Sequence, residues 1–236
     1  MKDTTMLASV VVPALNEAEN IGQCVTAARR GYAPDEVEIV VADGGSSDST
    51  PDLVPPDVTL IRSPRGRAVQ MNRGAAASRG EVLVFCHADS QLPADWREAV
   101  IEALSEPGVS GGTFQTLILP AQGILMHIRN RMRFPATWWR MYGDQAQFMR
   151  RATFARVGGF PEIPLMEDVE MMRALHREGR LVKLSLRVTT SSRRFLERGF
   201  LRQSLMNLWS VFRYLNLRAT PQDIARVYRS SREETL

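Results

Sequence analysis

Short apolar runs alternate with amphipathic segments over the first hundred residues. The runs are rich in β-branched residues and too short for core helices, which is typical of strands buried on both faces. Strands that alternate with helices predict a three-layer α/β fold around a mostly parallel, mixed sheet. The predicted strands are Ser9–Pro13, Glu36–Asp43, Val58–Ile61 and Glu81–Cys86.

Three helices are predicted between and after these strands. Asn16 is expected to cap the first, with Glu19 three residues later as in a capping box. The second covers Arg67–Arg79, and the third follows Cys86 with Pro93 in its first turn.

The second half is less regular, and its boundaries follow from weaker patterns. Strands are expected at Val109–Leu119, Gln145–Met149 and Leu181–Thr189. Because the chain has neither repeats nor a low-complexity linker, we expect one domain over residues 1–236, with parts at 1–105, 106–190 and 191–236. The predicted helices are Pro120–Arg133, Glu167–Glu178 (ended by Gly179), Phe200–Leu217 and Pro221–Arg232.

The net charge of +4 is small and does not indicate a nucleic-acid partner. It is unevenly placed, however, since residues 187–236 carry ten Arg against four acids. Cys24 and Cys86 lie in apolar stretches and are expected to be buried thiols rather than a disulfide. The N-terminus lacks a signal-peptide core, and no run approaches the roughly 18 apolar residues of a membrane span. The cytoplasm is therefore the expected compartment.

Polar residues follow three of the predicted strands, at Pro13–Glu17, Asp43–Ser47 and His87–Asp89. Ligands of open α/β sheets bind outside the carboxyl ends of strands. Asp43 either accepts hydrogen bonds from a base or ribose or satisfies loop amides. Asp89, with His87 beside it, either binds Mg²⁺ or Mn²⁺ shared with a diphosphate or caps the next helix.

Further candidates lie in the second half. Glu167 and Asp168 open a helix, where acids favour the helix dipole, but one of them could also serve as a general base. Gly143, Asp144 and Gln145 are either a turn or part of an acceptor pocket. The aromatic residues nearby are either an acceptor wall or a subunit contact; they are Trp138, Trp139 and Tyr142.

Several enzyme classes are disfavoured by missing motifs. The chain has no Gly-Lys-Ser/Thr phosphate loop, and no G-x-G-x-x-G follows the first strand, which argues against NTPases and dinucleotide oxidoreductases. His127 and His176 show no zinc spacing and are expected to be structural or surface residues.

Four ordered segments resemble the motifs of glycosyltransferase family 2, whose members have the GT-A fold. The resemblance implies a single-step, inverting transfer of a sugar from a nucleotide-diphosphate donor to an acceptor hydroxyl, with Mn²⁺ or Mg²⁺ as cofactor. The acceptor, a small molecule or a lipid, stays open. The segments are Ser9-Val-Val-Val-Pro-Ala-Leu-Asn-Glu17, Val41-Ala-Asp-Gly-Gly-Ser-Ser-Asp-Ser-Thr50, Gly80-Glu-Val-Leu-Val-Phe-Cys-His-Ala-Asp89 and Met166-Glu-Asp168.

Further segments resemble one subgroup, the radical-SAM/selenodomain-associated transferase 2 proteins, also described as arsenosugar-biosynthesis glycosyltransferases. This resemblance covers nearly the whole chain, including the basic C-terminal helices. The segments are Gly66-Arg-Ala-Val-Gln-Met-Asn72, Gly143-Asp-Gln145, Gly158-Gly-Phe-Pro161 and Ile163-Pro-Leu-Met-Glu-Asp168.

The family resemblance implies roles for individual residues. Residues 1–105 would bind the nucleotide-sugar, and residues 106–190 would carry the acceptor and catalytic groups. Asp43 would contact the base, often uracil, and Asp168, with Glu167 beside it, would be the catalytic base. Asp89 would bind the metal, with His87 as a further ligand. The implied donor-binding residues are Pro13, Ala14, Leu15, Asn16, Glu17, Asp43, Arg67, Ala88 and Asp89.

The chain lacks an acid at two positions where the family pattern has one. Ala42 stands where many members have an acid before Asp43, and His87 stands where the first acid of D-x-D would be. The Q-x-x-R-W sequence of processive members is absent, which disfavours a long-chain polysaccharide synthase.

The sequence leaves two other functions open. A sugar-nucleotide nucleotidyltransferase would need a Gly-rich, basic loop after the first strand, and Pro13–Glu17 has neither feature. A peripheral membrane or partner-binding module would use the last helices, where we expect one apolar side to cover the core, and a basic amphipathic helix on an anionic membrane is the alternative. That side comprises Phe200, Leu201, Leu205, Leu208, Trp209, Phe212 and Leu215.

Overall fold

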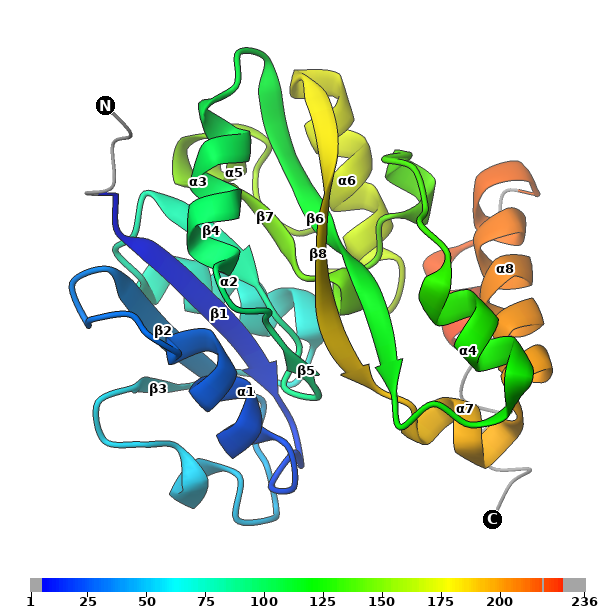
Figure 1. Cartoon of the computed structure of the whole chain (residues 1–236), viewed down its shortest axis with the longest axis horizontal. Coiled ribbons are helices and arrows are strands. Elements are labelled where there is room, and N and C mark those ends of the chain that lie inside the picture. Colours follow the sequence, from blue (N-terminus) through cyan, green and yellow to red (C-terminus); the bar gives the residue numbers. More distant parts are fainter. Residues whose placement is uncertain (1–5, 218, 227–236) are drawn as a thin grey trace.

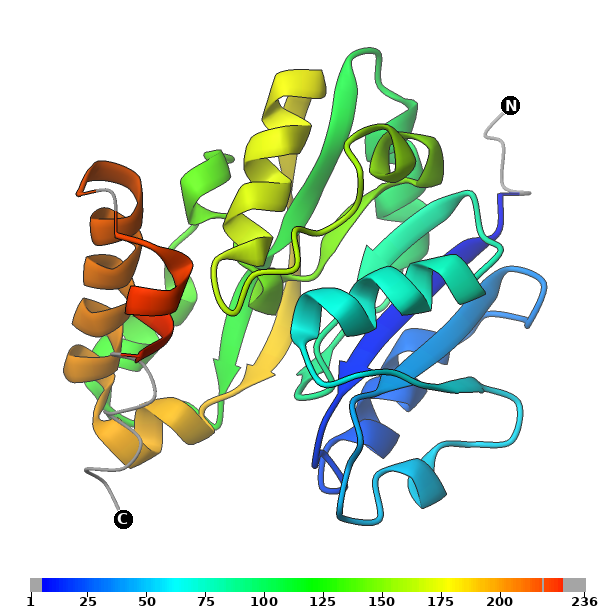
Figure 2. The ribbon, with the colours of Figure 1, turned by 180° about the vertical axis from the view of Figure 1, so that it is seen from behind.

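One sheet organises the molecule, with helices on both of its faces (Figures 1 and 2). The computed structural model describes residues 6–217 and 219–226. The sheet has eight strands in the order β3-β2-β1-β4-β7-β6-β8-β5. The predicted α/β architecture is therefore confirmed.

The first four strands are parallel neighbours formed by the apolar runs of the first half. They are β1 (Ala8–Ala14), β2 (Val37–Asp43), β3 (Thr59–Arg62) and β4 (Val82–Phe85). Every residue of β1, β2 and β4 is buried, because helices cover both faces. Since these strands run in one direction, their carboxyl ends meet at one edge of the sheet.

The second half adds strands that make the sheet mixed. The short strand β7 (Gln147–Arg150) is antiparallel to β4 and to β6 (Val109–Leu119). The long strand β8 (Arg180–Ser191) is parallel to β6, with β5 (Ser90–Gln91) antiparallel at the edge. The predicted Gln145–Met149 strand is thus shifted, because Gly143–Gln145 forms a 3₁₀ turn instead.

Helices cover the two faces according to the alternation of side chains along β1. Val10 and Val12 share a core with α1 (Ile21–Arg29) and α3 (Trp96–Ser105). Val11 points to the other face, into a core with α2 (Arg67–Ala77) and α6 (Glu167–Glu178). Figure 2 shows α2 and α6 in front of the sheet.

Short helices and turns connect these elements. Helix α8 (Phe200–Asn216) stands at the end of the molecule away from β3 (Figure 1), and residues 221–226 are helical. The rest of the helix predicted at Pro221–Arg232 lies outside the described residues. The remaining elements are η1 (Pro51–Leu53), α4 (Gly123–Arg131), η2 (Trp138–Arg140), η3 (Gly143–Gln145), α5 (Arg151–Arg156) and α7 (Arg193–Arg198).

Two predicted helix starts are wrong. Helix α1 begins at Ile21 rather than after Asn16, whose side chain accepts hydrogen bonds from Ser47 in the neighbouring loop. Helix α3 begins at Trp96, three residues after Pro93, because Asp95 takes a left-handed conformation with φ of 56°.

The orientation expected for α8 is also wrong. Leu201, Leu205 and Leu208 face solvent on this helix, whereas Gln203 and Ser210 are buried. Periodicity identified an apolar side of the helix, but that side does not cover the core.

Cys24 and Cys86 are buried free thiols, as expected. Among the described residues, no helix combines the length and apolar character that crossing a bilayer requires. The cytoplasmic location stays a prediction.

Close packing of β6 and β8 gives the first testable prediction. A Cβ atom on Gly112 would lie 2.2 Å from the carbonyl oxygen of Val182, so Gly112→Ala must disturb the strand pairing. We expect the free energy of unfolding to fall by about 1–3 kcal/mol. Gly22→Ala on α1, where nothing lies within 4 Å, should instead raise it by up to about 1 kcal/mol. Equal urea-unfolding curves for the two variants would contradict this account.

Candidate active site

Two loops at the carboxyl ends of β1 and β2 are tied together by hydrogen bonds. The Asn16 Oδ1 atom accepts from the backbone N–H of Ser47 at 2.8 Å, and the Asn16 N–H donates to Ser46 Oγ at 2.9 Å. The N–H of Glu17 donates to Thr50 Oγ1 at 2.8 Å. Asn16 has φ of 54°, a left-handed conformation that Asn tolerates better than most residues. The two loops therefore form one continuous rim.

The carboxylate of Asp43 holds the second of these loops. Its Oδ2 atom accepts from the N–H groups of Gly45 at 3.0 Å and Ser46 at 3.2 Å. Asp43 is buried, and these contacts match the predicted alternative in which it satisfies loop amides. Contact with a nucleotide base stays a prediction.

Gln70 on α2 binds the same edge of the sheet. The sequence pattern did not identify this residue. Its Nε2 donates to the carbonyl oxygens of Ala14 at 2.7 Å and Ala42 at 2.8 Å, the ends of β1 and β2. A buried amide inside a helix was the only available signal. Its partners are backbone atoms far along the chain, which no residue pattern reveals.

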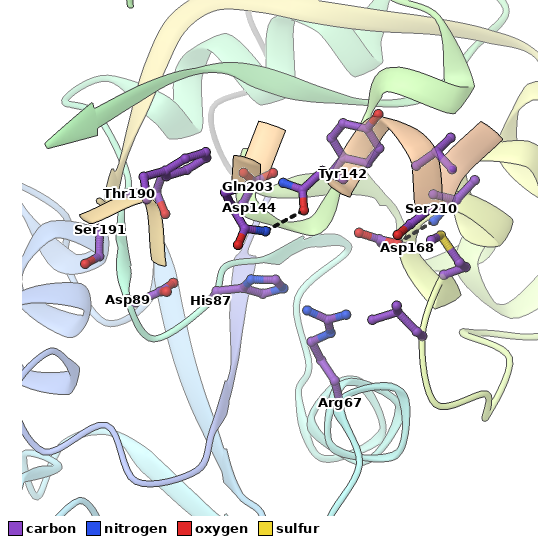
Figure 3. A pocket seen from close by; sticks show the side chains of 16 residues that line it. Arg67, His87, Asp89, Tyr142, Asp144, Asp168, Thr190, Ser191, Gln203 and Ser210 are labelled. Carbon is purple, nitrogen blue, oxygen red and sulfur yellow. Dashed lines mark hydrogen bonds between the residues drawn. The ribbon is translucent and has the colours of Figure 1, made fainter. Parts of the chain in front are cut away.

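A pocket of about 170 Å³ lies beside this rim. It brings together five of the predicted site residues, from β4's end, α2, η3 and α6 (Figure 3). The predicted donor residues before position 44 do not line it. Its lining includes Arg67, His87, Asp89, Tyr142, Asp144, Asp168, Thr190, Ser191, Gln203, Asn207 and Ser210.

Asp168 is held rigidly in the pocket wall. Its Oδ2 accepts from the backbone N–H of Gly143 and its Oδ1 from that of Val169, both at 2.8 Å. A Cβ atom on Gly143 would lie 2.7 Å from His87 Nε2, so any larger residue here would require the imidazole to shift. The Asp168 Oδ2 atom lies 3.5 Å from the same Cβ position, so His87 and Asp168 both border Gly143.

Glu167, the residue before Asp168, does not line the pocket. Its side chain is 1% exposed and forms an ion pair with Arg67, which does line it. Burial raises the pKa of Glu167, while the Arg67 guanidinium acts in the opposite direction. Glu167 thus contacts the pocket only through Arg67, and its role beside the catalytic base stays a prediction.

Asp144 is a third carboxylate in the pocket. Burial raises the pKa of Asp144, and the nearby charges of Asp168 and Asp89 raise it further, against an opposing effect of Arg129. Burial followed by the charges of Asp144 and Asp168 raises the pKa of Tyr142 to about 12, so this hydroxyl stays a hydrogen-bond donor.

Gln145, in the predicted acceptor turn, contacts β8, and its part in an acceptor pocket stays a prediction. Gln145 is buried, and its Oε1 accepts from Lys183 Nζ at 2.8 Å. Burial lowers the pKa of Lys183 to about 8. Ala88, one of the predicted donor residues, is buried in the hydrophobic core.

The donor set for a metal is sparse. Asp89 Oδ1 accepts from Ser90 Oγ at 3.3 Å, His87 lies two residues away, and Asp144 Oδ1 is buried without a hydrogen-bond partner. The described residues contain no group of three His, Cys, Asp or Glu able to hold an ion. One or two protein carboxylates nevertheless suit Mg²⁺ or Mn²⁺ when substrate phosphates supply further oxygens. Asp89 and His87 fit such a role.

The C-terminal elements complete the pocket. The end of β8 and the inner side of α8 line it, and Arg193 of α7 lies 3.8 Å from the Glu17 carboxylate in the first loop. The sequence showed no signal for these contributions, which come from Thr190, Ser191, Phe195, Gln203, Asn207, Ser210 and Val211.

The sequence profile described as "Glycosyl transferase family 2" matches residues 9–159, which span both loops, α2 and the end of β4. The chain belongs to this family. Membership confirms the family resemblance, whereas the arsenosugar-associated subgroup stays a prediction.

Two curated relatives illustrate this membership. The chain is 28% identical over 198 residues to the succinoglycan biosynthesis protein ExoA of Rhizobium meliloti, covering 75% of this chain and 60% of the relative. It is 29% identical over 118 residues to the glycosyltransferase AglE of Haloferax volcanii, covering 46% of this chain and 39% of the relative. This chain thus matches only part of the length of each of these two relatives.

Solved structures show that the fold is GT-A. Residues 1–349 of TarS from S. aureus superpose with a TM-score of 0.64 at 18% identity, covering 87% of this chain and 65% of that one. The mannosyltransferase PcManGT from Pyrobaculum calidifontis, in complex with GDP-Man and Mn²⁺, gives a TM-score of 0.64 at 22% identity, covering 93% and 68%.

The buried ion pair gives the second prediction. Arg67→Met leaves the Glu167 carboxyl buried without its partner, which should lower the free energy of unfolding by about 3 kcal/mol. The double variant Arg67→Met/Glu167→Met should recover most of that loss in urea unfolding. Arg73→Met, an exposed change on the same helix, should cost less than about 0.5 kcal/mol. A double variant no more stable than Arg67→Met would refute the pairing.

Proposed function

We propose that the chain transfers a sugar from a nucleotide-diphosphate donor to an acceptor hydroxyl, with inversion at the anomeric carbon. A UDP-sugar is the first candidate for the donor. The observation that carries this proposal is the pocket itself. Asp168 stands in one wall, His87 and Asp89 lie at the end of β4, and Arg67 lies between them (Figure 3). A fixed carboxylate, a cation and a second acid at the carboxyl edge of a parallel sheet suit this chemistry.

The proposed step is a single in-line displacement. Asp168 takes the proton of the acceptor hydroxyl as that oxygen forms a bond to the anomeric carbon. The bond from the anomeric carbon to the diphosphate oxygen breaks, and its electron pair leaves with the nucleoside diphosphate. The N–H groups of Gly143 and Val169 hold the carboxylate in one orientation throughout.

Arg67 and the loop rim would receive the donor. Glu167 orients the Arg67 guanidinium, which can offset charge on the diphosphate. The nucleoside would lie on the rim formed by the two loops, where Asn16 and Asp43 are held in place. A Mn²⁺ or Mg²⁺ ion held by Asp89, with His87, would act as a Lewis acid toward the diphosphate.

The subgroup and the acceptor class are proposed from sequence motifs. The motif set from Gly66 to Asp168 supports the arsenosugar-associated subgroup, and the acceptor is a small molecule or a lipid. A nucleotidyltransferase remains the weaker candidate, because the Pro13–Glu17 loop holds neither glycine nor a basic side chain for a triphosphate.

Nucleotide binding tests the donor assignment. Calorimetry against UDP, GDP, CDP and TDP should show Mn²⁺-dependent binding of one nucleotide, with UDP expected. Asp89→Asn should weaken that binding about tenfold or more by removing a charged ligand. Asp95→Asn, an exposed change six residues away, should leave it unchanged. If the wild-type protein bound none of the four nucleotides, the proposed function would be wrong.

Loss of the base tests the mechanism separately. Asp168→Asn preserves the shape of the side chain but cannot accept the proton, so turnover should fall about 10²–10⁴-fold. Release of the nucleoside diphosphate from the matching sugar donor measures this rate, and the nucleotide affinity should stay unchanged. Asp52→Asn, an exposed acid on η1, is the control. Unchanged turnover in Asp168→Asn would remove Asp168 from the role of base.

A further inference from the structure

Helix α8 turns its polar side toward the protein and its apolar side toward solvent, which is the opposite of a helix that covers a core. Its inner side carries Gln203, Asn207 and Ser210, which line the pocket. Its outer face, defined here as Leu201, Leu205, Leu208, Trp209 and Phe212, is 45–64% exposed at every position. A stripe of five large apolar side chains in solvent is unusual for a folded monomer and indicates an interaction surface.

A second cavity, of about 770 Å³, makes part of this face concave. It is a groove between α8 and η2, and Trp209 stacks on Phe212 at its edge with ring centroids 5.6 Å apart. Val211 lines both this groove and the polar pocket, so the two are neighbours. The groove residues are Trp138, Trp139, Arg173, Leu205, Leu208, Trp209, Val211, Phe212, Leu215 and Asn216.

The same end of the molecule also carries helix α4 (Figures 1 and 2), and α4 exposes apolar side chains of its own. Ile124 is 75% exposed, Leu125 43% and Ile128 51%. Apolar side chains therefore reach solvent from two helices at this end.

The charges of these segments all have one sign. Residues 120–143 contain four Arg and no acid, and α8 contains Arg202 and Arg213 and no acid. Arg131, Arg133 and Arg202 are exposed. Apolar side chains with Trp among them and Arg beside them are what an anionic lipid surface receives, because Arg can bury its stem and keep its charge at the headgroups.

Other occupants fit less well. A second copy docked by a two-fold axis would bring the Arg side chains of one copy toward those of the other, with no acid on either helix to offset them. Residues 227–236 of this chain include seven polar or charged residues out of ten and offer little apolar surface. An anionic bilayer can bury the apolar stripe in its hydrocarbon and pair the Arg side chains with its headgroups.

We propose that the outer face of α8 docks on an anionic lipid bilayer, with the helix lying in the headgroup region and the groove admitting a lipid hydrocarbon chain. The polar pocket then opens beside the membrane. This docking does not depend on the proposed transfer reaction.

Vesicle co-sedimentation tests the proposal. The wild-type protein should pellet with phosphatidylcholine vesicles that contain phosphatidylglycerol, less at high salt, and weakly with phosphatidylcholine alone. Leu205→Asp/Leu208→Asp should reduce the affinity by about tenfold or more. Leu53→Asp, an equally drastic change at an exposed leucine of η1, should pellet like the wild type.

Two further measurements make the result decisive. Circular dichroism melting should show all variants folded, and nucleotide calorimetry on the same samples reports the proposed function separately, so either idea can fail alone. Failure of the wild-type protein to pellet, or equal loss in Leu53→Asp, would overturn the docking proposal. So would a dimer in light scattering that Leu205→Asp/Leu208→Asp dissociates, since the face would then be a subunit interface.

Discussion

The ion pair between Arg67 and Glu167 joins two parts of the chain that lie a hundred residues apart. Each residue opens a helix, α2 and α6 respectively. A carboxylate that is 1% exposed needs a partner, so the start of α6 is stable only where Arg67 can reach it. A buried pair of this kind adds little net stability, but the rigid Arg fork makes it directional. Asp168, the next residue, lines the pocket, with its carboxylate held by the N–H groups of Gly143 and Val169.

Among the described residues, three acidic side chains and one Arg line the pocket. Asp89, Asp144 and Asp168 all line it, and the raised pKa of Asp144 reflects burial together with the other two charges. Arg67 offsets part of this charge from one side. A diphosphate placed beside Asp89 would meet repulsion that a divalent cation removes, which is the electrostatic reason for expecting a metal in the proposed transfer.

Helix α8 contributes to two surfaces, because its polar side faces the protein and its apolar side faces solvent. The polar side closes the pocket, and the apolar side remains outside. If this helix rested on a membrane, the pocket would be held beside that surface, and a lipid acceptor would need no separate delivery. Fold, charge and the groove at η2 thus converge on one end of the molecule.

The sequence by itself determined the sheet of the first half and the identity of the central acids. Parallel strands buried on both faces are continuous apolar runs, so β1, β2 and β4 were predicted to within two residues at each end. Helix α6 was predicted with its observed bounds, Glu167–Glu178, because acids start it and Gly179 ends it. Asp89 and Asp168 stood out because they lie at the ends of such elements.

Only the tertiary structure decided what surrounds those acids. Gln70 binds backbone carbonyls, and backbone atoms leave no trace in a residue pattern. Asn16 was expected to cap a helix but holds a loop, because its partner Ser47 lies 31 residues away. Periodicity showed that α8 has an apolar side, yet the direction of that side depends on what the rest of the chain places against the helix. Long-range contacts, which local patterns do not encode, therefore determined the pocket wall and the exposed face.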